Sequence, residues 1–160
     1  MADLRELLSG LGYGDVRTHL NSGNAVFTSR TGNPLKLARE IEKGIKDTLR
    51  LSVRCQVWSG DELRAVLAGN PFQKSATDGS KMLVLFLSEQ PDPTLLEAHD
   101  PTHLAREQIR VADRAIYQWC PDGFLAAPNV GAFAEKHLKV AVTARNWNTV
   151  TRLGVLLDEA

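Results

Sequence analysis

The apolar residues of the chain recur at two periods, one typical of helices and one typical of strands. The first apolar positions are spaced as one face of a helix, which Gly12 ends: Leu4, Leu7, Leu8 and Leu11. Residues 16–20 then alternate between apolar and polar, residues 21–24 have turn chemistry, and residues 25–28 predict a returning strand. We expect the chain to begin inside a helix that leads into a β-hairpin.

A second amphipathic helix is predicted after Asn33, which is a good N-cap, with Pro34 at the first helical position. Its apolar stripe consists of Leu37, Ala38, Ile41, Ile45 and Leu49. A strand over residues 51–58 is expected next. The segment Ser59-Gly-Asp-Glu62 matches a capping box, so a short helix should follow and end at Gly69.

Residues 81–88 are apolar at nearly every position, which is typical of a central strand with both faces covered. A short helix is predicted from Asp92 to Ala98, and a second hairpin over residues 108–120. Two further helices are expected, one after Asn129 and one over residues 146–157.

This order predicts an α+β fold made of tandem ferredoxin-like, or split β-α-β, halves with a C-terminal helix. Residues 1–58 would form the first half and residues 59–160 the second, joined in one compact unit. The first half is missing its opening strand, because the sequence starts at the helix. We expect either that Met1 is not the true start or that a neighbouring chain supplies the strand.

The composition of the 160 residues is that of an ordinary globular protein, with 43% hydrophobic residues. Nineteen basic residues balance nineteen acidic ones, which argues against a dedicated nucleic-acid binder but leaves a local basic patch open. Cys55 and Cys120 lack metal or redox spacing and are interpreted as reduced packing residues. No signal peptide or membrane span is recognised, so a cytoplasmic protein is expected.

Three stretches resemble an uncharacterised bacterial family, domain of unknown function 1697. They are residues 8–27 (LSGLGYGDVRTHLNSGNAVF), Asn70-Pro71-Phe72, and residues 143–150 (TARNWNTV). The resemblance covers nearly the whole chain. It implies tandem ferredoxin-like units and no established activity, substrate or cofactor.

The chain departs from that family at two places. Members begin further upstream, with a strand that ends in a glycine-rich turn, and this sequence has Met1 where an internal methionine would stand. The family also tends to have Ser-Lys after a Pro-x-Gly turn, whereas Gly123 is followed by Phe124 and Leu125. An activity that needs either feature is in doubt here.

Two polar segments are candidate ligand sites. Arg145, Asn146, Asn148 and Thr149 gather at a predicted helix N-terminus, where free amide N–H groups attract anions and Arg145 could bind a phosphate or carboxylate. The alternative is structural: Thr143 or Asn146 caps the helix, Trp147 fills the core and Arg145 pairs with an acid.

The hairpin turn offers the second candidate. Ser22, Gly23 and Asn24 could form an anion-binding nest, although glycine and asparagine are also what a turn needs for positive φ. Arg17 lies on the preceding strand and completes the predicted site. If the turn met Arg145 in space, both segments would gain support.

Three functions are compatible with these residues. The favoured one is a non-catalytic module that binds a small anionic ligand or a protein segment in a groove between the halves. The alternatives are a phosphoryl or acyl-phosphate enzyme, which lacks an identifiable general base, and a strand-mediated homo-oligomer such as a homodimer. The histidines and cysteines predict no metal site, no cofactor and no nucleophile.

Overall fold

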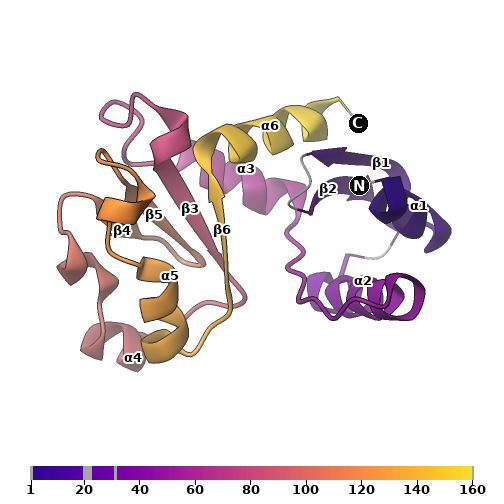
Figure 1. Cartoon of the computed structure of the whole chain (residues 1–160), viewed down its shortest axis with the longest axis horizontal. Helices are drawn as coiled ribbons and strands as arrows, with labels where there is room; N and C mark the ends of the chain where they lie inside the picture. The colour runs from indigo at the N-terminus through magenta and orange to yellow at the C-terminus, as the bar shows by residue number, and fades with distance from the viewer. Residues whose placement is uncertain (1, 20–22, 31, 160) are drawn as a thin grey trace. The chain divides into compact units, whose positions relative to one another are not determined.

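The computed structural model describes residues 2–19, 23–30 and 32–159. Over these residues the chain is a mixed α+β protein with six α-helices and two antiparallel sheets (Figure 1). It divides into two compact units. Unit 1 comprises Met1–Leu67 with Thr151–Ala160, and unit 2 comprises Ala68–Val150.

Unit 2 contains a four-stranded sheet with the spatial order β4-β5-β3-β6. Its strands are β3 (Met82–Leu87), β4 (Ile109–Val111), β5 (Ala115–Trp119) and β6 (Val142–Asn146). All neighbouring strands are antiparallel, and β3 pairs with both β5 and β6. The central strand predicted from the apolar run at residues 81–88 is therefore confirmed. Its residues are buried on both faces, apart from half-buried Leu83.

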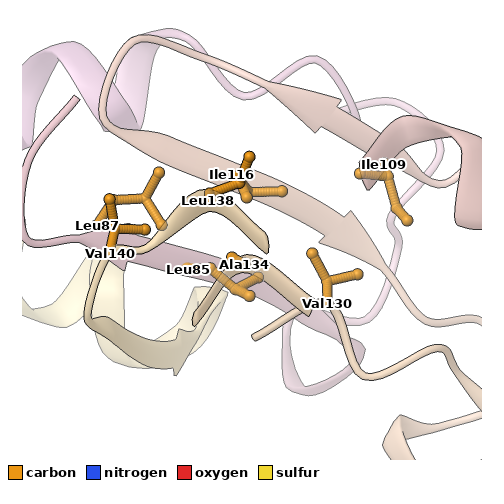
Figure 2. Packing of buried hydrophobic residues seen from close by; sticks show 8 residues of the cluster. All are labelled: Leu85, Leu87, Ile109, Ile116, Val130, Ala134, Leu138 and Val140. Atoms are coloured by element: carbon orange, nitrogen blue, oxygen red, sulfur yellow. The ribbon is translucent and has the colours of Figure 1, made fainter. Parts of the chain in front are cut away.

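The helices of unit 2 pack against one face of this sheet. They are α4 (Pro93–Ala98) and α5 (Val130–Phe133), which continues into a π-helical turn over Ala134–Leu138. Short 3-10 turns cover Gly79–Lys81, Pro101–Leu104 and Phe124–Ala126. Figure 2 shows the core that results: Leu85, Leu87, Ile109, Ile116, Val130, Ala134, Leu138 and Val140.

Unit 1 has a two-stranded sheet of β1 (Gly14–His19) and β2 (Asn24–Thr28). Its helices are α1 (Ala2–Gly10), α2 (Pro34–Leu49), most of α3 (Gly60–Ala68) and the C-terminal part of α6 (Trp147–Asp158). The buried cluster joins α1 to α2 and consists of Leu7, Leu8, Tyr13, Leu37, Ile41 and Ile45. Residues of β1 and β2 pack against it, so the hairpin covers the two helices.

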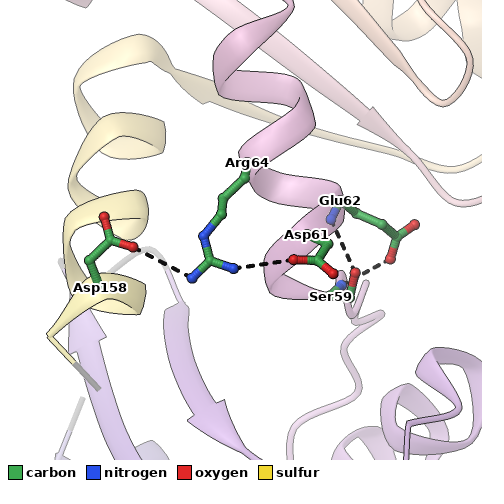
Figure 3. Close-up of polar contacts among 5 residues, drawn as sticks. All are labelled: Ser59, Asp61, Glu62, Arg64 and Asp158. Atoms are coloured by element: carbon green, nitrogen blue, oxygen red, sulfur yellow. Dashed lines mark hydrogen bonds and ion pairs between the residues drawn. The ribbon is translucent and has the colours of Figure 1, made fainter.

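Local capping signals in the sequence are confirmed. Asn33 accepts hydrogen bonds from the backbone N–H groups of Leu35 and Lys36, and Pro34 begins α2. The Ser59 hydroxyl accepts from the N–H of Glu62 at 3.1 Å, and the Glu62 carboxylate accepts from the N–H of Ser59 at 2.9 Å (Figure 3). This reciprocal pair is a capping box, and it starts α3 where the pattern places it.

Arg64 adds two ion pairs within unit 1. Its guanidinium lies 3.3 Å from Asp61 and 3.5 Å from Asp158, near the end of α6 (Figure 3). Half of the Arg64 side chain and most of both carboxylates are exposed, so solvent screens these pairs and they contribute little to stability.

Two sequence predictions need correction. Residues 51–59 belong to no strand, although an extended strand was expected over 51–58. A strand needs a hydrogen-bonded neighbour, and the sheet of unit 1 contains only β1 and β2. Conversely, the sequence pattern predicts no strand over residues 142–146, where the structure has β6.

The predicted α+β class is confirmed. The division into two ferredoxin-like halves, residues 1–58 and 59–160, stays a prediction. Among the residues that the structure describes, no helix is long and apolar enough to cross a membrane.

Candidate functional site

The Arg145 segment lies in unit 2, where β6 ends and α6 begins. Arg145 is half-buried on β6 opposite Val84, and its Nη1 donates to the Ala144 carbonyl at 2.9 Å. Burial lowers the pKa of the Arg145 guanidinium. An arginine that has lost part of its water shell is a stronger partner for an anion than a fully exposed one.

Asn146 caps α6. Its side-chain oxygen accepts from the backbone N–H of Thr149 at 2.9 Å, so one donor at this helix end is already occupied. The capping interpretation of Asn146 is therefore confirmed. Thr149 is buried, whereas Asn148 is exposed and its side-chain oxygen lies against Gly79, which leaves no space for a Cβ there.

The hairpin turn lies in unit 1. Gly23 is exposed and has a φ of 84°, a left-handed conformation that favours glycine. Asn24 is buried, pairs with His19 across the hairpin and donates from its side chain to the His19 carbonyl at 3.1 Å. These contacts support the structural role of the turn. Ser22 lies outside the described residues.

Arg17 points to the C-terminal end of the chain, within unit 1. Its two Nη atoms donate to the carboxylate and to the backbone carbonyl of Glu159, both at 2.9 Å. The pair is partly exposed, with side-chain exposures of 36% for Arg17 and 47% for Glu159. A ligand at Arg17 would therefore compete with Glu159.

The predicted site residues fall into two groups. Arg17, Gly23 and Asn24 belong to unit 1, whereas Arg145, Asn146, Asn148 and Thr149 belong to unit 2. The first group lies on the β1–β2 hairpin, and the second lies where β6 ends and α6 begins. The prediction that the groups meet in one anion site stays a prediction.

Other titratable groups serve packing. The Tyr13 hydroxyl donates to Glu40 at 2.9 Å and its ring stacks on Phe27, and burial together with this carboxylate raises the pKa of Tyr13 to about 12. Burial also raises the pKa of the thiols of Cys55 and Cys120, which disfavours the reactive thiolate.

Two histidines stack in unit 2. The rings of His99 and His137 lie 4.6 Å apart with an angle of 24° between their planes. Near-parallel rings do not direct their nitrogens at one point, so this pair is not arranged to chelate a metal. Across the described residues, no group of three or more histidine, cysteine, aspartate or glutamate side chains could hold a metal ion.

Two further features carry potential chemistry that the sequence interpretation missed. The exposed face of α2 carries Lys36, Arg39, Lys43 and Lys46, and the helical period of the basic residues would have revealed it. Residues 51–57 belong to neither sheet of the described chain, which only the structure could show.

Comparisons with known proteins place the chain in a family and support its fold. The family model described as "Protein of unknown function (DUF1697)" matches residues 1–117. A search of curated proteins finds no match. The solved structure of the conserved bacterial protein SP0830 from Streptococcus pneumoniae is 22% identical, with a TM-score of 0.63, and the match covers 98% of this chain and 88% of that one. At this identity the similarity is one of fold. Because the family model spans most of its length, this chain belongs to the DUF1697 family.

Proposed function

We propose that the protein is a binding module whose unit 1 takes up an extended segment of another polypeptide as a β-strand. The segment would lie between β2 and residues 51–57, a position that we name the strand slot. The proposal includes a ferredoxin-like arrangement of both units, complete in unit 2 and lacking one strand in unit 1.

The single observation that carries the proposal is a comparison within the chain. Unit 2 has the order β3, α4, β4, β5, α5 and β6, and β3 lies between β5 and β6. Unit 1 has a counterpart for each element after β3, in the same order: α1, β1, β2, α2 and the extended residues 51–57. Within the described residues, unit 1 has no strand that pairs with both β2 and residues 51–57.

The two sides of the strand slot rest on the same helical layer. Ala25 and Phe27 of β2 pack against the α1–α2 cluster, and so do Cys55 and Val57 of the extended segment. Neither side pairs with the other as strands do. The Cys55 N–H instead donates to the Glu42 carboxylate at 3.0 Å. An extended backbone beside a sheet edge is a template for adding a strand, because its N–H and C=O groups point sideways.

The chemistry of the occupant follows from β3, which fills the equivalent place in unit 2. All but one of the β3 residues are buried, because a central strand contacts side chains on both faces. On the 51–57 side of the strand slot, Leu51 and Val53 are 55% and 43% exposed, so their side chains could contact an apolar occupant. We therefore expect an apolar segment of about six residues without proline.

The binding test uses the strand that unit 2 already employs. A fluorescent peptide of residues 81–88, with lysines added at its ends for solubility, is titrated with the full chain. We expect saturable binding at or below about 100 μM, read by anisotropy, and a peptide with proline in its centre should not bind. No binding of the β3 peptide, in a protein that also sediments as a monomer at that concentration, would reject the proposal.

Two adjacent proline substitutions separate strand pairing from general loss of structure. The amides of Val53 and Arg54 donate no hydrogen bond within the described part of the chain, so proline at either place should cost little stability. In an extended segment, neighbouring amides point to opposite edges. One of Val53→Pro and Arg54→Pro should therefore abolish binding while the other leaves it nearly unchanged. Equal effects of the two would contradict strand pairing.

A further inference from the structure

The exposed face of α2 carries a row of positive charge. Lys36, Arg39, Lys43 and Lys46 are all exposed, and we name these four residues the basic stripe. At about 100° per residue they fall within an arc of about 80°, and they span about 15 Å along the helix axis. The stripe lies opposite the face on which Leu37, Ile41 and Ile45 enter the core. Arg50, the C-cap residue, adds an exposed cation just beyond it.

The acids of α2 form no ion pair with the stripe within the described residues, although the charged carboxylate of Glu40 lies beside Lys36 and Lys43. Glu40 accepts the hydrogen bond of Tyr13, and Glu42 accepts that of the Cys55 N–H. Asp47 is exposed but makes no ion pair with the stripe. Within the described ranges, none of the four basic side chains forms an ion pair, so their charge faces solvent.

The arrangement is unfavourable for the helix itself. Successive members of the stripe are three or four residues apart, so they are neighbours on the helix surface and repel one another. The first turn contains no acid and includes Lys36, which opposes the helix dipole. Successive members of the stripe lie closer together than about 10 Å, the distance over which salt screens charge, so each cation adds to the field of its neighbours. An anionic partner would relieve this repulsion.

A shallow hollow of about 410 Å³ lies along the same helix. Asn33, Leu35, Lys36, Arg39, Glu40 and Lys43 line it. Three of these side chains belong to the basic stripe and one is the carboxylate of Glu40, so an anionic group in the hollow would meet three cations and one like charge.

We propose that the basic stripe binds the phosphate backbone of nucleic acid without reading its sequence. A linear row of cations matches a linear row of phosphates. The helix contains no aromatic residue on which a base could stack, so backbone contact is the mode that it supports. Insertion into a lipid surface is disfavoured, because the apolar face of α2 is occupied by the core of unit 1. The charge balance of the whole chain adds no attraction beyond this patch.

Salt dependence tests the proposal. The full chain is titrated into two labelled DNA duplexes of unrelated sequence, each of about 20 base pairs, at several salt concentrations. Four phosphate contacts predict a slope of about −3.6 for log K against log salt, so affinity should fall about 150-fold from about 50 to about 200 mM salt. Both duplexes should bind alike, because phosphates carry no sequence information.

Two variants that each lose three positive charges test whether the basic stripe is the part of the protein that contacts DNA. Lys36→Gln, Lys43→Gln and Lys46→Gln are combined in one variant, which should weaken binding at low salt and reduce the fall over that salt range to about 3.5-fold. The control combines Lys74→Gln, Arg106→Gln and Lys136→Gln, three exposed cations of unit 2, and should keep the parent slope. Glutamine suits the exposed helical positions of the stripe, and circular dichroism melting tests whether both variants fold.

Three results would overturn the proposal. One is the absence of DNA binding at about 50 mM salt and about 100 μM protein, conditions that favour weak electrostatic complexes. Another is a parent-like slope in the stripe variant. The third is binding to phosphatidylserine vesicles without binding to either duplex, which would assign the stripe to an anionic membrane surface.

Discussion

Units 1 and 2 differ in their sheets and in the quality of their cores: within the described residues, unit 1 has a two-stranded sheet and unit 2 a four-stranded one. In unit 2, β3 lies between two partners, and Leu87, Ile109 and Ile116 of the core are 0% exposed. In unit 1 the cluster residues other than Leu8 retain 5% to 8% exposure, as at Leu37 and Ile45. In unit 2 the central strand β3 covers the helical layer along its middle, whereas no described strand of unit 1 has two partners, and most of its core side chains stay slightly open to water.

The comparison also shows how unit 1 compensates. Unit 2 holds β5 and β6 through backbone pairing with β3. Unit 1 instead ties its elements together with side chains: Tyr13 reaches Glu40 of α2, and Glu42 of α2 accepts from the backbone of Cys55. Side-chain contacts are fewer and more exposed than a ladder of backbone hydrogen bonds. We expect unit 1 to open more readily than unit 2.

The largest predicted effect contrasts one core leucine from each unit. Leu87→Ala removes a fully buried side chain from β3 and should destabilise unit 2 by about 3 to 5 kcal/mol. Leu37→Ala in the more open cluster of unit 1 should cost less, about 2 to 3 kcal/mol, because water and neighbours can fill the space. Urea unfolding followed by hydrogen exchange in each unit measures both. A larger loss at Leu37 would refute the ranking of the two cores.

Tyr13→Phe tests the side-chain tie of unit 1. The substitution removes the hydrogen bond to Glu40 but keeps the ring on Phe27, and it should cost about 1 kcal/mol. In the folded state the pKa of Tyr13 is raised to about 12, above the usual value of 10.0, so folding favours the protonated phenol. This contribution is complete below pH 10 and is lost as the pH rises to about 12.

The cost of Tyr13→Phe should therefore shrink as the pH rises through that range. Parent and variant unfolding in urea at matched pH values isolates the effect. Tyr117, whose pKa is also raised by burial, stays in both proteins and cancels from the difference. A cost that does not change between pH 10 and pH 12 would show that folding does not raise the pKa of Tyr13.

The sequence predicts those elements that depend only on residues close together in the chain. The capping box at Ser59 and Glu62 and the cap at Asn33 depend on neighbouring residues alone, so the pattern is sufficient. The central strand β3 is recognisable because burial on both faces leaves almost no polar position. The segment 51–57 has the composition of a strand, but a strand also requires a partner, which lies elsewhere in the chain or in another molecule.

In the candidate sites, too, contacts between neighbouring residues could be predicted from sequence and contacts between distant residues could not. The cap formed by Asn146 follows from its place before Trp147, whereas the contact of Arg17 with Glu159 joins residues 142 positions apart and could not be predicted. The basic stripe was predictable in principle. Its cations repeat with the helical period of α2, but the partners of Glu40 and Glu42, the acids of the same helix, are Tyr13 and Cys55, which lie outside it.

The smallest predicted effect concerns the stacked histidines of unit 2. Burial, the neighbouring His99, and the charges of Lys136 and Lys139 lower the pKa of His137 below its usual 6.5. The unfolded chain therefore takes up a proton that the folded chain resists, so stability is constant above about pH 6.5 and falls as the pH drops below it. His137→Gln should reduce this fall, measured by urea unfolding between about pH 8 and about pH 5.

Lys136→Gln is the matched control, because it changes a neighbouring exposed residue and leaves the stack intact. It should retain most of the acid destabilisation, since burial and His99 are the larger causes of the shift. Hydrogen exchange in α4 and in the turn Ala134–Leu138 should report the loss first, because His99 and His137 join these two segments. If His137→Gln leaves the acid fall unchanged while exchange increases first around β1 and β2, the acid-sensitive contact lies in unit 1 and not in the histidine stack.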